Sequence, residues 1–175
     1  MFKARQAVSG DYRPCTLIDR SYTTNHVWQV ARQFEGEDAA ITFRAVRLPR
    51  PVTVKDDEPA DQQISRWLRA DAFFVVEDEV PIGYLALDVD ADRGAAHVRE
   101  VVVQPERRRR GVGRLLLGEA RQWSRAQGLQ ILLAETQTRN FPAIRFFLTN
   151  GFTFCGYNEC AYPTRDIAVY LAFST

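Results

Sequence analysis

The segment with the clearest chemical potential is the arginine- and glycine-rich run at residues 106–114, which reads Glu-Arg-Arg-Arg-Arg-Gly-Val-Gly-Arg. It lies between a run typical of a buried strand and a run with helical spacing. At such a junction, the free N–H groups of the helix start and the positive end of the helix dipole favour an anion. Gly111 and Gly113 permit close approach of a diphosphate to the backbone. The run therefore predicts a phosphate site, and a tight turn with a solvated basic face is the alternative.

Other phosphate-binding motifs fit this run less well. It lacks the Gly-Lys-Ser/Thr ending of a P-loop and the third glycine of a dinucleotide-binding fingerprint. The whole chain has 23 Lys and Arg against 22 Asp and Glu, a net charge of +1. No bulk charge therefore favours nucleic acid or a membrane surface, and we expect neither as a partner.

The elements around the loop predict an α/β (α+β) fold in a single domain over residues 1–175, since 175 residues with 46% hydrophobic content suit one core. A hairpin is expected from runs 15–34 and 38–47, its second arm ending at Leu48-Pro49-Arg50-Pro51. The acidic stretch 55–61 leads into a helix carrying Ile64, Trp67 and Leu68. Runs 72–76 and 82–89 then indicate an antiparallel strand pair, followed by a turn at 90–94.

The second half of the chain predicts a parallel crossover. A strand at 98–103, a helix from Val112 to a stop at Gly128 and a strand at 129–135 follow one another, so the sheet is expected to be mixed. A short helix follows from Asn140 to Leu148, and runs 152–157 and 167–173 supply the last strands.

Arg108-x-x-Gly111-x-Gly113 matches the Gln/Arg-x-x-Gly-x-Gly/Ala signature of the GNAT acetyltransferases, and the chain resembles that family over residues 98–164. The run 135–140, Glu-Thr-Gln-Thr-Arg-Asn, and the later Tyr162-Pro-Thr are similar to streptothricin acetyltransferases. The resemblance implies a mixed sheet of about seven strands, flanked by helices and splayed between its two parallel central strands.

The resemblance also implies acetyl-CoA as cosubstrate. In the family, backbone N–H groups at the positions of Arg109 to Arg114 bind the pyrophosphate, and the strand matching Val101 to Val103 pairs with pantetheine. The predicted cofactor residues are Val101, Val102, Val103, Arg108, Arg109, Arg110, Gly111, Val112, Gly113, Arg114, Asn140 and Phe147. An unpaired N–H near Val102 or Val103 would polarise the thioester carbonyl.

Acetyl transfer to an amine requires removal of a proton, because an alkylammonium has a pKa of about 10. Glu135, at the end of the second parallel strand, matches a carboxylate that serves as general base in several family members. His97 is the second catalytic candidate. The alternatives are a structural role for Glu135 and an inconsequential edge histidine at His97.

Two further family positions have ambiguous roles. Asn140 matches a cofactor-contacting asparagine and is equally suited to cap the following helix. Phe147 stands where the family usually has a tyrosine that protonates the CoA thiolate, so Tyr157, Tyr162 or Tyr170 would have to replace it.

Three functions stay open at this point. The first is transfer of acetyl to a primary amine of a small molecule, of streptothricin type, by direct attack in a ternary complex, with a role in antibiotic resistance. The second is protein or peptide N-acetylation, and the third is a non-catalytic acetyl-CoA-binding module. A cationic acceptor would favour carboxylates or aromatic faces, and the candidates are Asp56, Asp57, Glu58, Asp88, Asp90, Tyr22, Trp28 and Phe34. The alternatives are solvated acidic turns and aromatic side chains that belong to the core.

The remaining features bear on location and assembly. Cys15, Cys155 and Cys160 lack metal-ligand spacing, and His26 and His97 are distant in sequence, so no metal is expected. We expect reduced thiols, no leader segment and a cytoplasmic protein. The sequence leaves a homodimer open.

Overall fold

The computed structural model describes residues 2–175 and shows a mixed α/β architecture. Its elements are β1 (Ala4–Gln6), η1 (Ser9–Asp11), α1 (Tyr12–Cys15), β2 (Tyr22–Glu35), β3 (Asp38–Val54), α2 (Ala60–Trp67), β4 (Ala72–Asp78), β5 (Val80–Asp90), β6 (Ala95–Val103), η2 (Pro105–Arg107), α3 (Val112–Ala126), β7 (Ile131–Gln137), α4 (Phe141–Thr149), β8 (Thr153–Asn158) and β9 (Ala168–Ser174). Seven strands are hydrogen-bonded in the order β1-β4-β5-β6-β7-β9-β8, and β2 and β3 form a separate two-stranded sheet.

The chain divides into two compact units. Unit 1 contains residues up to Arg20, Asp56–Glu135 and Ala172–Thr175, and unit 2 contains Ser21–Lys55 and Thr136–Leu171. Strands β7 and β9 each contribute residues to both units. Strands β4, β5 and β6 pair antiparallel, and β6 pairs parallel with β7, which confirms the predicted mixed sheet and crossover.

In unit 1, helices cover both faces of the sheet because its central strands are apolar on both sides. Helix α3 lies on one face, where Trp123 packs edge-on against Phe74. On the other face, Trp67 of α2 packs against Phe73 and Tyr84, whose rings are stacked. Trp67 and Tyr84 are fully buried.

Helix α3 ends as the sequence predicted. Gly128 has φ +73°, the left-handed conformation that glycine adopts at no steric cost, and β7 follows three residues later in the chain at Ile131. Helix α2 and the strand pair β4–β5 that follows it also lie where the sequence placed them, to within two residues at the strand ends. None of the described helices is long and apolar enough to cross a membrane.

In unit 2, the β2–β3 hairpin differs from the prediction at both ends. Residues before Tyr22 form a helical turn that includes Cys15, so the first arm begins later than expected. The second arm continues to Val54 through Pro49 and Pro51. Both prolines fall where the β2–β3 register shifts, between the pairs of Thr24 and His26, so no regular ladder bond is lost there.

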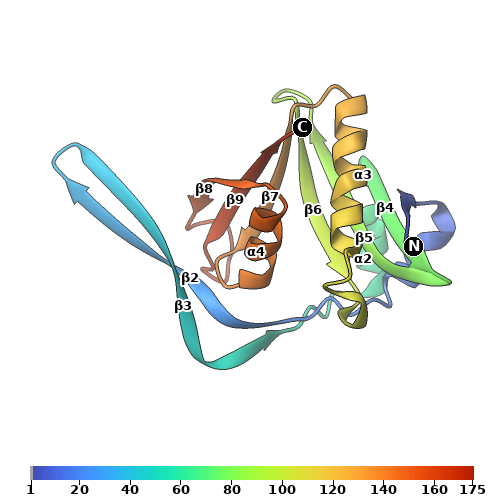
Figure 1. Cartoon of the computed structure of the whole chain (residues 1–175), viewed down its shortest axis with the longest axis horizontal. Coiled ribbons are helices and arrows are strands. Elements are labelled where there is room, and N and C mark those ends of the chain that lie inside the picture. Colours follow the sequence, from blue (N-terminus) through green and yellow to red (C-terminus); the bar gives the residue numbers. More distant parts are fainter. Residues whose placement is uncertain (1) are drawn as a thin grey trace. The chain divides into compact units, whose positions relative to one another are not determined.

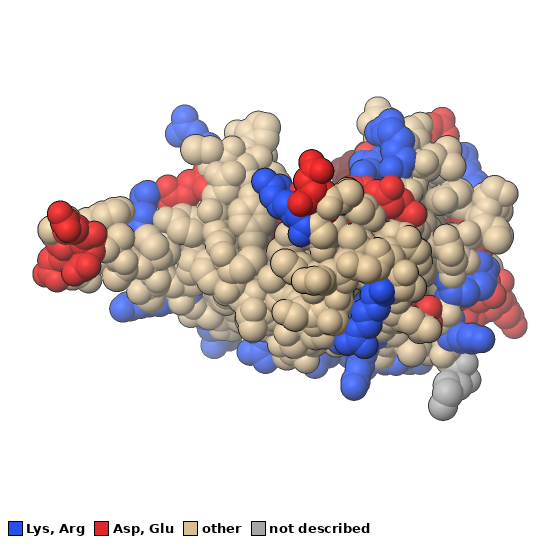
Figure 2. Space-filling model, turned by 90° about the horizontal axis from the view of Figure 1, so that it is seen from above, with Lys and Arg blue, Asp and Glu red and all other residues tan. Residues whose placement is uncertain are grey.

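The far end of the hairpin is charged and exposed. Acidic side chains gather there (Figure 2), and they belong to Glu35, Glu37 and Asp38. Nearer the other end, Trp28 packs on Phe43, which also contacts Phe154 and Tyr157.

Candidate active site

The loop between β6 and α3 has the geometry of an anion-binding turn. Arg109 and Gly111 both have positive φ, at +63° and +86°, and Gly111 caps the helix that begins at Val112. The first N–H groups of a helix have no intrahelical acceptor, and they carry the positive end of its dipole. Arg109, Arg110 and Gly111 are exposed, so this end of α3 is accessible to an anion.

The side chain of Arg108 holds the loop together. Its Nε donates to the carbonyl of Val103 over 2.9 Å, and Nη2 donates to the carbonyl of Asp19 over 3.3 Å. Burial lowers the pKa of the Arg108 guanidinium. This arginine therefore bridges the end of β6 to the loop, and the backbone that follows it, at Arg109 to Gly111, is exposed.

Close packing ties β5, β6 and the start of α3 together at Gly83. A Cβ placed on Gly83 would lie 2.9 Å from the carbonyl oxygen of Val102, 3.0 Å from Cγ1 of Val112 and 3.4 Å from Cδ1 of Leu116. Only a glycine allows the helix start to approach the two strands this closely. No local pattern predicts this contact, because it joins residues far apart in the chain.

The predicted cofactor strand has a free edge. Pairing of β6 with β7 runs from Ala95 opposite Ile131 to Val98 opposite Ala134, while β6 itself continues to Val103. Within the described residues, no β7 residue pairs with β6 beyond Val98. The other edge of β6 stays paired with β5 up to Val103. The backbone of the final β6 residues is thus open on one side, as a strand-adding ligand requires.

Both predicted catalytic residues lie in unit 1. Glu135 is exposed and follows Ala134, the last β7 residue paired with β6. His97 is half-buried within β6, opposite Asp88 on one side and Leu133 on the other.

The two remaining predicted residues lie in unit 2. The Asn140 side chain accepts a hydrogen bond from the Ala143 N–H over 3.2 Å, so it is the N-cap of α4. Phe147 is 3% exposed and packs against Phe146 and Phe152. Its ring belongs to the core beneath α4.

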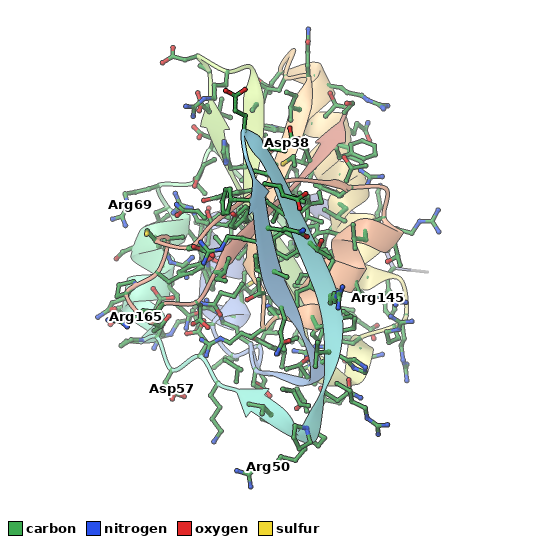
Figure 3. All side chains as sticks on the ribbon, turned by 90° about the vertical axis from the view of Figure 1, so that its left-hand side faces the viewer. Asp38, Arg50, Asp57, Arg69, Arg145 and Arg165 are labelled. Carbon is green, nitrogen blue, oxygen red and sulfur yellow. The ribbon has the colours of Figure 1, made fainter. Side chains whose placement is uncertain are left out.

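Most carboxylates considered as acceptor contacts are bound to arginines. Asp88 forms a two-point ion pair with Arg99, both contacts 2.6 Å, and Asp90 pairs with Arg93 at 2.9 Å. Asp56 and Glu58 both pair with Arg20. Asp57 projects from its loop into solvent (Figure 3) and has no ion pair within the described part of the chain.

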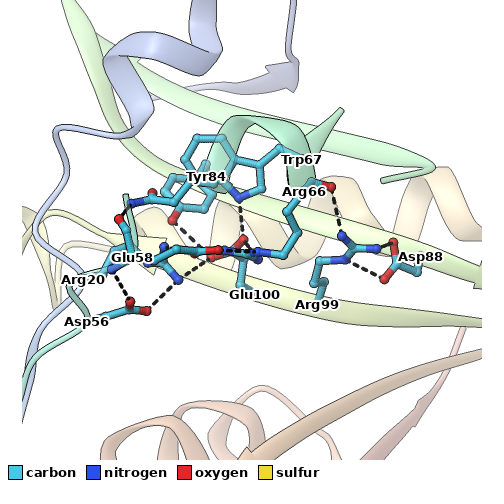
Figure 4. A network of polar contacts seen from close by, with 10 residues as sticks. Arg20, Asp56, Glu58, Arg66, Trp67, Tyr84, Asp88, Arg99 and Glu100 are labelled. Atoms are coloured by element: carbon cyan, nitrogen blue, oxygen red, sulfur yellow. Dashed lines mark hydrogen bonds and ion pairs between the residues drawn. The ribbon is translucent and has the colours of Figure 1, made fainter. Parts of the chain in front are cut away.

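A buried polar network, missed by the sequence reasoning, surrounds Glu100 (Figure 4). The Glu100 side chain is 10% exposed and accepts from Arg66, Trp67 and Tyr84, the last over 3.2 Å. Arg20 lies 3.3 Å from it. Burial, reinforced by the Glu100 charge, raises the pKa of the Tyr84 hydroxyl.

The same network includes the loop that precedes α2. Arg20 pairs with Asp56 at 2.7 Å and with Glu58 at 3.0 Å, and Glu58 also binds Arg66. The Arg66 hydrogen bond lowers the pKa of the Glu58 carboxyl. Glu100, within the apolar run of β6, was the one sequence feature that could have indicated this network, because a buried charge needs partners.

Among the described residues, no group of three or more His, Cys, Asp or Glu side chains is arranged to hold a metal ion. Cys15 is buried, and Cys155 and Cys160 are exposed free thiols.

The mixed sheet with its parallel β6–β7 pair is the fold expected of a GNAT acetyltransferase. Residues 40–152 match the family model for acetyltransferases of the GNAT family, and the chain belongs to that family. This confirms the resemblance found in the sequence.

Individual relatives extend the likeness beyond the family motif. The chain is 27% identical to the streptothricin acetyltransferase of Streptomyces lavendulae over 165 residues, which cover 92% of this chain and 86% of that protein. The crystal structure of nourseothricin acetyltransferase superposes with a TM-score of 0.85 at 26% identity, covering 99% of this chain and 98% of the other. A Bacillus anthracis str. Ames protein crystallised with acetyl coenzyme A shares the fold, with a TM-score of 0.80 at 18% identity over the whole of both chains.

Proposed function

We propose that this acetyltransferase moves the acetyl group of acetyl-CoA to a primary amine of a small cationic molecule of the streptothricin class. The observation that carries this proposal is the likeness to the streptothricin acetyltransferase over nearly the whole of both chains. GNAT members with different acceptors share the anion-binding turn. Only a likeness that extends over the N-terminal half and the late strands therefore bears on the acceptor.

The donor would bind along unit 1. The N–H groups of Arg109 to Arg114 supply donors and a positive dipole end for the CoA diphosphate. The open edge of Val101 to Val103 would pair with the amide groups of pantetheine, as an added strand does. Beside the turn, a groove of about 470 Å³ runs along α3, lined by Gly111, Arg114, Leu115, Gly118, Glu119 and Gln122. This groove offers room for the nucleotide end of CoA.

In the proposed reaction, the neutral amine nitrogen attacks the thioester carbonyl carbon directly. The carbonyl electrons move to oxygen, where an N–H near Val102 or Val103 would stabilise the charge. The tetrahedral intermediate then collapses, the C–S bond breaks and CoA leaves as a thiolate. Glu135 would accept the proton that the ammonium group must lose before or during attack. Its exposure, next to the point where β6 and β7 stop pairing, supports this role.

Protonation of the leaving thiolate would not depend on Phe147. A phenyl ring cannot donate a proton, and this one lies in the core of unit 2. A thiol with a pKa near 8.5 is a tolerable leaving group without an acid. Water would then supply the proton. The tyrosines that the sequence offered as alternatives, Tyr157, Tyr162 and Tyr170, are half-buried in unit 2.

A CoA-release assay tests the proposal. The purified chain is mixed with acetyl-CoA and each member of three panels: streptothricin-class antibiotics, other small amines and peptides. We expect rapid CoA release with the streptothricin-class compounds. CoA release with the peptide panel alone would show that the acceptor is a polypeptide and not a small molecule. Tight acetyl-CoA binding without release in any panel would make the chain a non-catalytic binding module.

The order of events is tested in the same mixtures. Direct attack predicts that acetyl-CoA alone leaves the protein mass unchanged. A stable acetylated protein that passes its acetyl group to acceptor after removal of CoA would overturn direct attack.

A further inference from the structure

Strand β6 contains a bulge at the residue where it leaves β7. Ala86 of β5 lies opposite Glu100 and Leu87 lies opposite Val98, so Arg99 is an extra residue without its own partner in β5. Val98 is also the last β6 residue paired with β7. A bulge locally disrupts the ladder and bends the strand. At Arg99, the β6 backbone is therefore paired regularly with neither β5 nor β7.

Arg66, near the end of α2, contacts both residues at the bulge. Nη1 of Arg66 donates to Oε1 of Glu100 over 2.6 Å, and the carbonyl oxygen of Arg66 accepts from Nη1 of Arg99 over 2.9 Å. Arg66 thus binds the bulged residue Arg99 through its backbone carbonyl and binds Glu100 through its guanidinium (Figure 4). The remaining nitrogens of Arg99 are fixed by Asp88.

Arg66 itself is held in one position. Its Nη2 and Nε donate to Glu58, and its side chain is 24% exposed. The planar guanidinium therefore joins two carboxylates, Glu58 on the loop before α2 and Glu100 on β6. A lysine could not reproduce this arrangement, because an ammonium group lacks the fixed fork of donors.

We propose that Arg66 is a positioning residue for acetyl transfer: by fixing Arg99 and Glu100 it sets the path of Val101 to Val103. This inference rests on the proposed function, in which those three residues present the backbone that receives pantetheine and polarises the thioester. Val102 packs against the same buried cluster as Trp67 and Tyr84, so the strand is anchored directly beyond the bulge. A small displacement of reacting groups is costly, since about 1 Å can lower the rate on the order of a hundredfold.

The test uses Arg66→Met, which keeps the length of the stem and removes the fork, together with Arg66→Lys. Glu100→Gln is a second route, because it keeps the shape of the acceptor side chain and removes its charge. The matched control is Asp61→Asn on the same helix, which breaks an exposed ion pair with Arg13. All variants are studied as the full chain.

Amide hydrogen exchange of the segment 98–103 is measured first, without ligand. Arg66→Met and Glu100→Gln should speed exchange there by about tenfold or more, while α3 in these variants exchanges at the wild-type rate. The Asp61→Asn control should exchange at the wild-type rate throughout. In steady-state assays, Arg66→Met should lower kcat by about tenfold or more. Arg66→Lys should recover less than half of the lost kcat.

Two results would overturn the positioning role. One is a fall in Tm with unchanged kcat per folded molecule. The other is faster exchange that spreads evenly over the unit instead of concentrating at 98–103. If the wild type itself releases no CoA with any acceptor, the proposed function fails, whereas the exchange comparison still decides whether Arg66 fixes the strand.

Discussion

Replacing Gly83 by alanine tests whether the close contact of β5, β6 and α3 builds the donor site. The added Cβ would lie 2.9 Å from the Val102 carbonyl oxygen and 3.0 Å from Cγ1 of Val112, and both distances are shorter than ordinary contacts. The first neighbour is backbone and the second is the first residue of α3, so neither can move without moving the proposed cofactor surface. Overpacking of this kind costs about 1–3 kcal/mol.

For a chain of this size, about 1–3 kcal/mol corresponds to a fall in Tm of roughly 2–12 °C. Differential scanning fluorimetry measures it, and acetyl-CoA titration calorimetry should show weaker binding in the same variant. Gly10→Ala is the control, because a Cβ at Gly10 meets no heavy atom within 4 Å. Wild-type Tm and wild-type acetyl-CoA affinity in Gly83→Ala would refute the packing argument and the location of the donor site together.

Further predictions follow from single residues. Gly111→Val places a β-branched residue at φ +86°, a strain of about 1–3 kcal/mol, and acetyl-CoA affinity measured by calorimetry should be lost or fall by roughly tenfold or more. Glu135→Gln should lower kcat/KM by at least about tenfold near neutral pH, and an unchanged pH–rate profile would exclude Glu135 as the base. When the protein is treated with a thiol-alkylating reagent at pH 8, Cys160 should react first. Cys155 should react more slowly, because burial raises its pKa and so lowers the fraction of reactive thiolate. Burial also raises the pKa of Cys15 to about 12, so its labelling should require unfolding, and mass spectrometry would expose a native-state reaction that contradicts this.

The fold was predictable where one short-range signal dominated. Helical spacing from Val112 and a glycine at 128 defined α3, and the run that follows could then only be a parallel strand. The start of the hairpin was predicted wrongly because Cys15 lies in an apolar run that folds as a helical turn against Trp67 and Phe73. That choice depends on tertiary burial, which a local pattern does not contain.

The sequence allowed candidate residues to be named, but it did not contain the contacts among them. The cap by Asn140 followed from residue type and position, whereas the positive φ of Arg109 and Gly111 was not predicted. The network around Glu100 did not, because it joins α2, β5 and β6 through side chains that are distant in sequence. The bulge at Arg99 was equally hidden, since it is a property of strand register.

Mass spectrometry of the acceptor is the most direct test of the proposed acetyl transfer from acetyl-CoA to a streptothricin-class amine. Enzyme, acetyl-CoA and a streptothricin-class antibiotic are incubated together, and each component is omitted in turn. We expect one added acetyl group on a primary amine of the antibiotic, formed only when all three are present. An unmodified antibiotic in a mixture where the enzyme demonstrably binds acetyl-CoA would contradict it.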